Sequence, residues 1–155
     1  MLLRPATPED VPNVLPLVKK ICDLHRAWDP QRFGFKDNIE QIYHSWMIER
    51  ANDKRSPFFL AERSGQVVAY IVGSVEREIP IYWMPECGWI HDLWVDEGYR
   101  NEGIARQLVM LSVEHFKSIG QTQVRLNTAQ VNSIARSLFE SCNFRVCTQE
   151  MLLEL

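Results

Sequence analysis

The hydrophobic positions near the start of the chain repeat at the spacing of a helix. From Val11 to Cys22 apolar residues recur every three or four positions. Thr7 can act as the N-cap, because Asp10 follows three residues later. Pro12 and Pro16 fall inside this stripe, so we expect irregular first turns. A short strand, residues 1–4, precedes it.

A second helical stripe follows after a polar and aromatic segment. Residues 25–35, "HRAWDPQRFGF", are typical of a loop. Asp37 can then cap a helix whose apolar residues extend to Met47, with Glu40 three residues after the cap.

The middle of the chain changes to strand periodicity. Residues 57–63 and 66–78 are rich in β-formers, and Ser64-Gly65 between them is suited to a tight hairpin turn. Residues 79–86 predict a loop, and residues 87–95 predict a third long strand in this region.

The last third alternates helix and strand. The predicted elements are a helix at 102–119 ended by Gly120, a strand at 122–129, a short helix capped by Asn132 and ended by a left-handed Asn143, and one or two closing strands in 144–155. The order β-α-α-β-β-β-α-β-α-β predicts an α/β fold with a mixed sheet and helices on both faces.

Composition narrows the functional classes. A chain of 155 residues with 46 % hydrophobic residues suits one domain. The net charge of −3 disfavours non-specific nucleic-acid binding, and no apolar run has membrane-spanning length. The first ten residues do not resemble a secretory signal, and no cysteine pair has CxxC spacing, so we expect reduced thiols and a cytoplasmic protein. Cys22-x-x-His25 lacks a second pair of ligands, so no metal site is predicted.

The stretch "VDEGYRNEGIARQLV", residues 95–109, lies where a predicted strand gives way to a predicted helix. The first N–H groups of a helix have no intrahelical partners and attract anions. Gly103 and Ala105 allow a ligand close to the backbone, and Arg100 adds a forked donor suited to phosphate. The stretch therefore indicates a pyrophosphate cradle, although it is neither a Walker A loop nor a GxGxxG motif.

Two motifs resemble the GNAT superfamily of acyl-CoA-dependent N-acyltransferases. Its central pattern, Arg/Gln-x-x-Gly-x-Gly/Ala after Leu-x-Val, matches Arg100, Gly103 and Ala105 after Leu93-Trp94-Val95. Its second pattern matches "NSIARSLFESCNF", residues 132–144, with Asn143 in place of a glycine. The resemblance implies a single N-acetyltransferase-like domain over residues 1–155, with a mostly antiparallel sheet whose central strands splay apart beside a bulge.

The resemblance also implies that acetyl-CoA binds in the splayed cleft. Backbone of the central strand would pair with the pantetheine, the turn would hold the pyrophosphate, and the short helix would contribute further contacts. Arg136 is equally typical of a solvated helix surface. The cofactor-binding residues implied are Leu93, Trp94, Val95, Arg100, Asn101, Glu102, Gly103, Ile104, Ala105, Arg106, Asn132, Arg136 and Phe139.

The candidate chemistry lies on the central strand. His91 can serve as a general base toward an amine, or it can be a structural histidine at the strand surface. Asp92 can orient His91, attract an ammonium or bond to the backbone. Strand alternation separates the side chains of His91 and Asp92 unless a bulge intervenes. The resemblance implies a backbone oxyanion donor at Leu93 or Trp94. At the position of the usual tyrosine acid stands Phe139, so we expect that acid to be dispensable.

Acceptor recognition is predicted from the loop after the first helical stripe. Trp28, Asp29 and Phe33 can form an ammonium site together with His91, or the aromatic residues can anchor the loop to the core. The aromatic residues of 79–86 can line the pocket or form a dimer contact, and homodimers are common in the GNAT superfamily.

The sequence therefore predicts acetyl transfer from acetyl-CoA to a primary amine of a small molecule, less readily of a protein. The alternative is a catalytically weak acyl-CoA-binding or regulatory module, which Phe139 favours and His91 disfavours.

Overall fold

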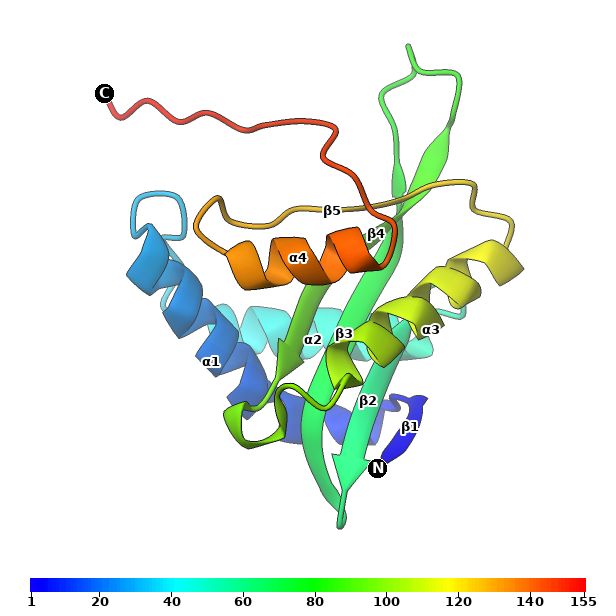
Figure 1. The fold of residues 1–155 in the computed structure, drawn as a ribbon. Coiled ribbons are helices and arrows are strands. Elements are labelled where there is room, and N and C mark those ends of the chain that lie inside the picture. Colours follow the sequence, from blue (N-terminus) through cyan, green and yellow to red (C-terminus); the bar gives the residue numbers. More distant parts are fainter.

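The computed structural model describes residues 1–155 as one five-stranded sheet covered by helices (Figure 1). The strands are β1 (Leu2–Pro5), β2 (Phe58–Arg63), β3 (Gln66–Arg77), β4 (Glu86–Val95) and β5 (Val124–Leu126). The helices are α1 (Val11–Trp28), α2 (Ile39–Asn52), α3 (Ile104–Ser118) and α4 (Ser133–Ser141), with short 3-10 turns η1 (Pro8–Asp10) and η2 (Glu97–Tyr99). The strands neighbour one another in chain order, and every pair is antiparallel except β4 and β5. The predicted fold class is confirmed.

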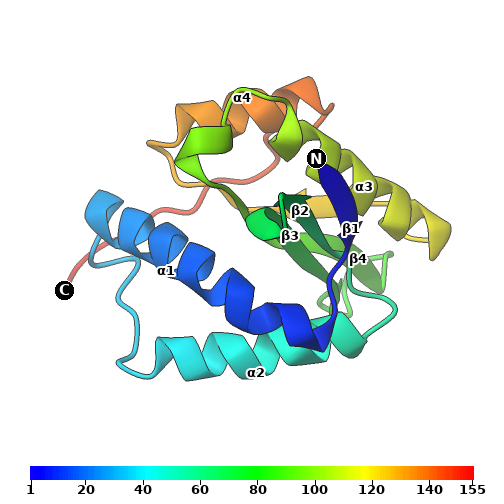
Figure 2. The ribbon, with the colours of Figure 1, turned by 90° about the horizontal axis from the view of Figure 1, so that it is seen from below.

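Two helical layers enclose the sheet. Figure 2 shows α1 and α2 on one side of it and α3 and α4 on the other. On β3, Tyr70 and Val72 pack into the α1–α2 core, whereas Ala69 and Ile71 pack into the core beneath α3 and α4. This alternation is the period-two pattern of a strand buried on both faces.

The N-terminal helices differ in detail from the prediction. The irregular first turn takes the form of η1, where the N–H of Thr7 donates to the Asp10 carboxylate at 2.8 Å. Helix α1 then continues to Trp28, so the start of the expected loop is helical. The cap of α2 is Asn38, one residue after the predicted Asp37.

The C-terminal prediction is wrong. Residues 144–155 form no strand, and the predicted strand at 122–129 shortens to β5. A closing strand needs a neighbour to complete its hydrogen bonds, and β5 offers three residues before the chain turns away. β-forming composition alone does not supply that neighbour.

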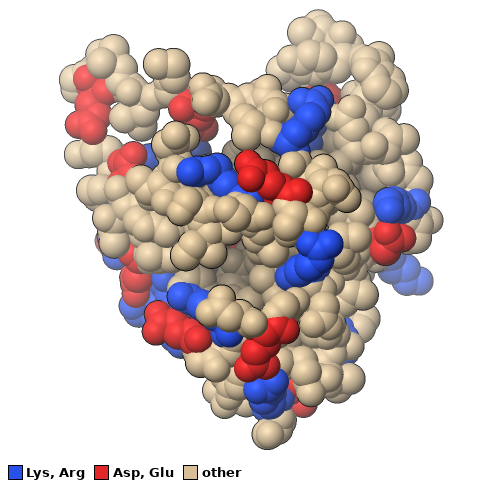
Figure 3. Space-filling model, viewed as in Figure 1, with Lys and Arg blue, Asp and Glu red and all other residues tan.

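Three further properties bear on the class of protein. No helix combines the length and apolar character needed to cross a bilayer. All four cysteines are free, with Cys147 exposed and the other three buried. On the face shown in Figure 3, basic and acidic residues are interspersed, in keeping with the net charge of −3.

An ion cluster joins β1 to the start of the helical layer. Both terminal nitrogens of Arg4 donate to the Asp10 carboxylate at 2.7 Å, and Arg4 also contacts Glu62 of β2 at 3.1 Å. The hydrogen bonds from Arg4 lower the pKa of Asp10 to about 2, against the opposing effect of burial. The ionised carboxylate is therefore stabilised in the folded state.

We expect the ion pair between Arg4 and Asp10 to make a pH-dependent contribution to stability. Asp10→Asn should lower the free energy of unfolding by about 2 kcal/mol at pH 7. Since folding depresses the pKa of Asp10, this contribution exists above pH ~4 and disappears as the pH falls toward 2. Urea unfolding across this range measures it. Glu114→Gln, which breaks an exposed pair with Lys117, is the control and should cost under ~0.5 kcal/mol.

Candidate active site between β4 and β5

The cleft opens where β4 and β5 part. The two strands pair at three positions, from Gly88 with Val124 to Ile90 with Leu126. Beyond Ile90, β4 continues to Val95, whereas the chain after Leu126 leaves the sheet. A cleft of about 1350 Å³ lies here, lined by residues of β4, both helical layers and the C-terminal segment.

A bulge at His91 changes the side-chain pattern of β4. Ile90 pairs with Gly73 and Asp92 with Val72, so His91 is an extra residue on β4. Ile90 packs into the core beneath α3 and α4. His91 instead contacts Trp46 of α2, with ring centroids 5.3 Å apart, and Asp92 lies against Tyr43 of α2. The bulge therefore turns His91 and Asp92 toward the same helical layer.

The bulge also fixes which backbone groups of β4 face the gap. The N–H of Asp96 donates to Val68 of β3 at 2.8 Å. Because successive residues of a strand direct their N–H groups to opposite sides, Asp92 and Trp94 point theirs toward β3. Leu93 and Val95 then point theirs away from β3, and Leu93 lines the cleft. As a backbone donor, Leu93 fits the geometry and Trp94 does not.

His91 is held by two side chains of β3. Its Nε2 lies 2.6 Å from Ser74 Oγ and 3.3 Å from Glu76 Oε1, and Ser74 Oγ donates to Glu76 at 2.5 Å. Since Ser74 gives its proton to Glu76, its oxygen accepts the N–H of His91 Nε2. In the neutral ring Nδ1 then carries the lone pair, and Nδ1 has no hydrogen bond in the structure.

The side chain of His91 is half-buried, and this partial burial affects its charge. It lowers the pKa of His91 below the ordinary 6.5, with Arg50 adding to this effect, and the nearby Glu76 acts in the opposite direction. The ring is therefore mainly neutral at pH 7 and able to accept a proton at Nδ1.

The sequence analysis named Asp92 but not the buried tyrosines that surround it. Burial raises the pKa of Asp92 to about 6, and the hydroxyls of Tyr43 and Tyr70 oppose it. Asp92 Oδ2 and Tyr70 Oη are buried without a hydrogen-bond partner. Tyr70 and Val72 share a face of β3 with Ser74 and Glu76, so strand alternation is the signal that could have grouped them.

The N-terminus of α3 presents a row of free donors. The first backbone N–H of this region that bonds within the helix is that of Gln107, which donates to Gly103 at 3.1 Å. The N–H groups of residues 101–106 have no acceptor in the protein. Gly103 has φ of 76°, a left-handed conformation that favours glycine. The turn thus forms an anion-binding cradle without needing side chains.

The side chains of this turn point elsewhere. Arg100 donates to the carbonyl of Val95 at 3.1 Å and stacks over the Trp94 ring. Glu102 pairs with Arg63, and Arg106 donates to Ser141 of α4 at 2.7 Å. The predicted contacts at Glu102 and Arg106 are therefore available through backbone, and Arg100 must leave Val95 to reach a phosphate.

Helix α4 brings three predicted residues to the opposite wall of the cleft. Asn132 Oδ1 accepts the N–H of Ala135 at 3.1 Å, which caps the helix as expected and leaves the amide nitrogen free. Arg136 donates to the carbonyl of Gln130 in its own loop. Phe139 is buried against Phe144, with ring centroids 5.7 Å apart.

The predicted acceptor residues lie on the α1 side of the same cleft. The His25 ring lies 5.4 Å from that of Trp28 and 4.8 Å from that of Phe33. The Asp29 carboxylate accepts the N–H groups of residues 31 and 32, so it stabilises the turn after α1. Trp28, Asp29, Phe33 and His91 thus share one cavity.

The C-terminal segment covers part of this cavity. Residues 144–150 line the cleft, and Glu150 forms an ion pair with Arg32 in the turn after α1. Figure 1 shows the segment crossing from α4 toward the end of α1. The residues predicted to form closing strands therefore contribute to the wall of the cleft.

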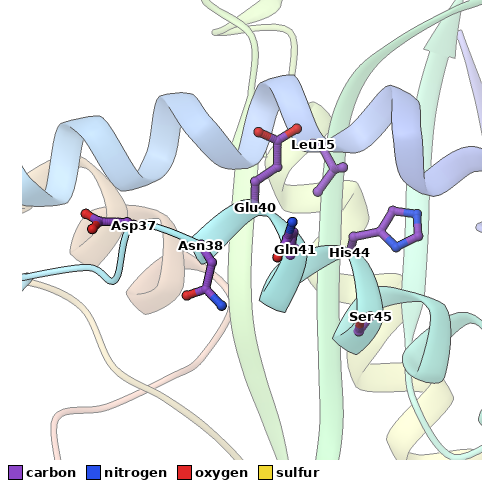
Figure 4. Close-up of a pocket in the computed structure, with 7 residues that line it drawn as sticks. All are labelled: Leu15, Asp37, Asn38, Glu40, Gln41, His44 and Ser45. Carbon is purple, nitrogen blue, oxygen red and sulfur yellow. The ribbon is translucent and has the colours of Figure 1, made fainter.

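Other surface features lie apart from this cleft. Figure 4 shows a second hollow, of about 870 Å³, lined by Leu15 of α1 and by polar residues at the start of α2. Its side chains, among them Glu40, Asn38 and His44, point in different directions. Tyr82 and Trp83 are exposed on the β3–β4 connection and do not line the cleft.

Comparisons with known proteins identify the family. Residues 18–144 match the Acetyltransferase (GNAT) family, so the chain belongs to it. Mycothiol acetyltransferase of Thermobispora bispora is 30 % identical over 126 residues, which are 77 % of this chain and 42 % of that protein. The chain spans about half the length of the first curated relatives it matches.

Solved structures support the fold. A mutant of a Bacillus halodurans protein has a TM-score of 0.87 at 23 % identity, with 100 % of this chain and 99 % of that chain covered. AAC(6')-Iy, bound to the bisubstrate analogue CoA-S-monomethyl-acetylneamine, has a TM-score of 0.76 at 14 % identity, with coverage of 99 % and 97 %. At these identities the likeness concerns the fold alone.

The site fits the acetyl-CoA that the GNAT family uses. An elongated thiol arm can pair with the free edge of β4 at Leu93 and Val95, and a pyrophosphate suits the free N–H groups that follow. The fit rests on unsatisfied backbone donors of this chain.

The cradle predicts a sensitive position at Gly103. Gly103→Glu should weaken coenzyme A binding at least tenfold, because a left-handed backbone disfavours the residue and a negative charge faces the pyrophosphate. Calorimetric titration with coenzyme A measures the affinity. Gly98→Glu in η2 adds the same charge where a Cβ meets nothing within 4 Å, and should retain most of the affinity. Equal affinities for Gly103→Glu and wild type would refute the cradle.

Proposed function

We propose that this chain is a single-domain N-acetyltransferase that moves an acetyl group from acetyl-CoA to a primary amine of a small molecule. One observation carries the proposal: the free backbone edge of β4 leads into the free N–H groups of α3 beside a neutral histidine with an open Nδ1. The backbone N–H groups that would bind acetyl-CoA and the candidate base His91 therefore lie close together in the sheet.

The acyl donor would lie along backbone groups of the chain. Leu93 and Val95 would hold its thiol arm, residues 101–106 its pyrophosphate, and Asn132 its amide groups through the free amide nitrogen. When bound, acetyl-CoA supplies a thioester carbonyl, to which the amine nitrogen bonds as the carbon–sulfur bond breaks and the thiolate leaves.

Leu93 would polarise that carbonyl. Its N–H points away from β3 after the bulge and needs no rearrangement to donate. Removing such a donor in other enzymes costs about 10²–10³ in rate. The donor belongs to the backbone, so side-chain substitution at Leu93 would leave it in place.

His91 would take the proton that the amine loses. The conjugate acid of an alkyl amine has a pKa near ~10.4, so most of the amine is protonated at pH 7. It must give a proton to an acceptor before its nitrogen can attack. Glu76 and Ser74 fix Nε2 as the donor nitrogen, which directs the Nδ1 lone pair to the substrate, directly or through a water.

A small acceptor suits the partly covered form of the cleft. Trp28 and Phe33 lie at one end, and the C-terminal segment joined to Arg32 by Glu150 covers part of the opening. This arrangement favours a compact amine over the chain of a folded protein.

The central test is thiol release from acetyl-CoA in the presence of an amine panel that includes a peptide with a free N-terminus. Amine-dependent release supports the transferase. Tight coenzyme A binding with no turnover on any amine favours the alternative, an acyl-CoA-binding module. No coenzyme A binding would refute both functions.

A prediction follows for His91. His91→Gln should lower kcat by about 10²–10³ with little change in coenzyme A affinity, since proton transfer is lost and the cradle is intact. In wild type, activity should fall as the pH drops through a value below 6.5, where His91 becomes protonated. Glu76→Gln should shift this fall to lower pH, because Glu76 raises the pKa of His91.

The control for these pH–rate profiles is His44→Gln, an exposed histidine of α2 outside the cleft. Its profile should match wild type. A His91→Gln enzyme with wild-type kcat and an unchanged acidic limb would rule out the base role.

A second kinetic prediction concerns Phe139. We expect the thiolate to leave without a tyrosine acid, because a thiol with a pKa near ~8.5 is a tolerable leaving group. Phe139→Tyr should therefore change kcat at saturating substrates by less than about threefold. Single-turnover measurements would contradict this if the chemical step became greatly faster.

A further inference from the structure

We propose that Asp92 is the receptor for the ammonium group of the acceptor, and that the cleft selects a primary amine attached to an apolar or aromatic group. The proposal rests on the proposed function and deepens it by naming the acceptor class. Asp92 would act as a specificity-determining residue beside His91.

The first argument is that the Asp92 carboxyl group has no charged partner, although the Tyr43 and Tyr70 hydroxyls lie beside it. The residue is 8 % exposed, it lines the cleft, and its Oδ2 has no hydrogen-bond partner. It forms no ion pair with any lysine or arginine of the chain. A buried carboxylate without a counter-ion is costly, so a cation that enters the cleft gains an unusually favourable partner.

The second argument is that the neighbours of Asp92 are neutral. Cys22 of α1, Tyr43 of α2, Tyr70 of β3 and His91 of β4 are the titratable groups packed around it. Burial raises the pKa of the Cys22 thiol to about 11 and that of both tyrosines above its usual range. None of these groups supplies a positive charge at pH 7, since burial keeps His91 neutral.

The third argument is the position that the bulge gives to Asp92. With regular alternation, Asp92 and His91 would face opposite helical layers. The extra residue turns both toward α1 and α2, in the same cleft. An ammonium held at Asp92 is therefore delivered beside the nitrogen proposed to take its proton.

The fourth argument is the aromatic wall, defined here as His25, Trp28, Phe33, Tyr43 and Trp46. All five line the cleft, and their rings form two groups. His25 contacts Trp28 and Phe33, and Tyr43 contacts Trp46, which in turn contacts His91. Such a wall stabilises apolar groups by burial and a cation by its ring faces. An amine with an aryl group on a short chain matches both features.

The test compares phenethylamine with 2-phenylethanol, its neutral counterpart, by calorimetry with and without coenzyme A. Wild type should bind the amine at least tenfold more tightly than the alcohol at pH 7.5. This preference should shrink as the pH falls through about 6, where the Asp92 carboxylate takes up a proton. Asp92→Asn should abolish the preference while keeping the affinity for the alcohol.

The control is Asp23→Asn, which removes an exposed carboxylate of α1 outside the cleft and should retain the preference for the amine. The pH dependence of wild type serves as a second measurement that needs no variant. Equal binding of both probes by wild type, or binding of neither in both conditions, would overturn the proposal.

Thermal unfolding separates a receptor from a structural anchor. Folding raises the pKa of Asp92, so its charge destabilises the folded protein increasingly as the pH rises from ~4 through 6. Asp92→Asn should therefore raise Tm at pH 7.5, and the gain should vanish near pH 4. A lowered Tm with unchanged preference for the amine would make Asp92 an anchor of Tyr43 and Tyr70.

These outcomes are distinguishable from failure of the proposed function. A wild type that binds phenethylamine through Asp92 but releases no thiol from acetyl-CoA refutes the transferase and leaves the receptor standing. Thiol release with amines, without discrimination between the two probes, refutes the receptor alone.

Discussion

One extra residue in β4 is the constraint on which the site depends. The bulge at His91 reverses the alternation of β4, so that His91 and Asp92 share a face and Leu93 directs its N–H away from β3. Pairing with β5 ends at Ile90, immediately before the bulge. The cleft, its backbone donors and its ionisable side chains all originate at this irregularity.

In the proposed function, the two sides of the cleft would recognise their ligands by different means. The acetyl-CoA side would use backbone N–H groups of β4 and α3, whose positions depend on the fold and tolerate changes of side chain. The amine side would use side chains of α1, α2 and the C-terminal segment. Donor binding can therefore persist while acceptor preference changes.

This division explains how much could be predicted from the sequence. Gly103 and the strand-to-helix change around it indicated the cradle, because a left-handed backbone position favours glycine and is therefore visible in the sequence. The sequence also predicted most elements and the gathering of Trp28, Phe33 and His91. The sequence could not reveal the cluster around Asp92, because that cluster depends on the register between β3 and β4. It also could not reveal the path of residues 144–155, where composition favoured a strand that has no neighbour in the sheet.

The path of the C-terminal segment has an evolutionary consequence. Apart from Phe144, its large apolar residues, such as Met151 and Leu153, are exposed rather than packed in either core, so substitutions there carry little folding cost. The same segment borders the cleft proposed to hold the amine, and Glu150 joins it to the turn after α1. In the proposed function, substitutions in the last dozen residues would change acceptor preference without disturbing the fold, which makes this end of the chain a natural place for specificity to diverge.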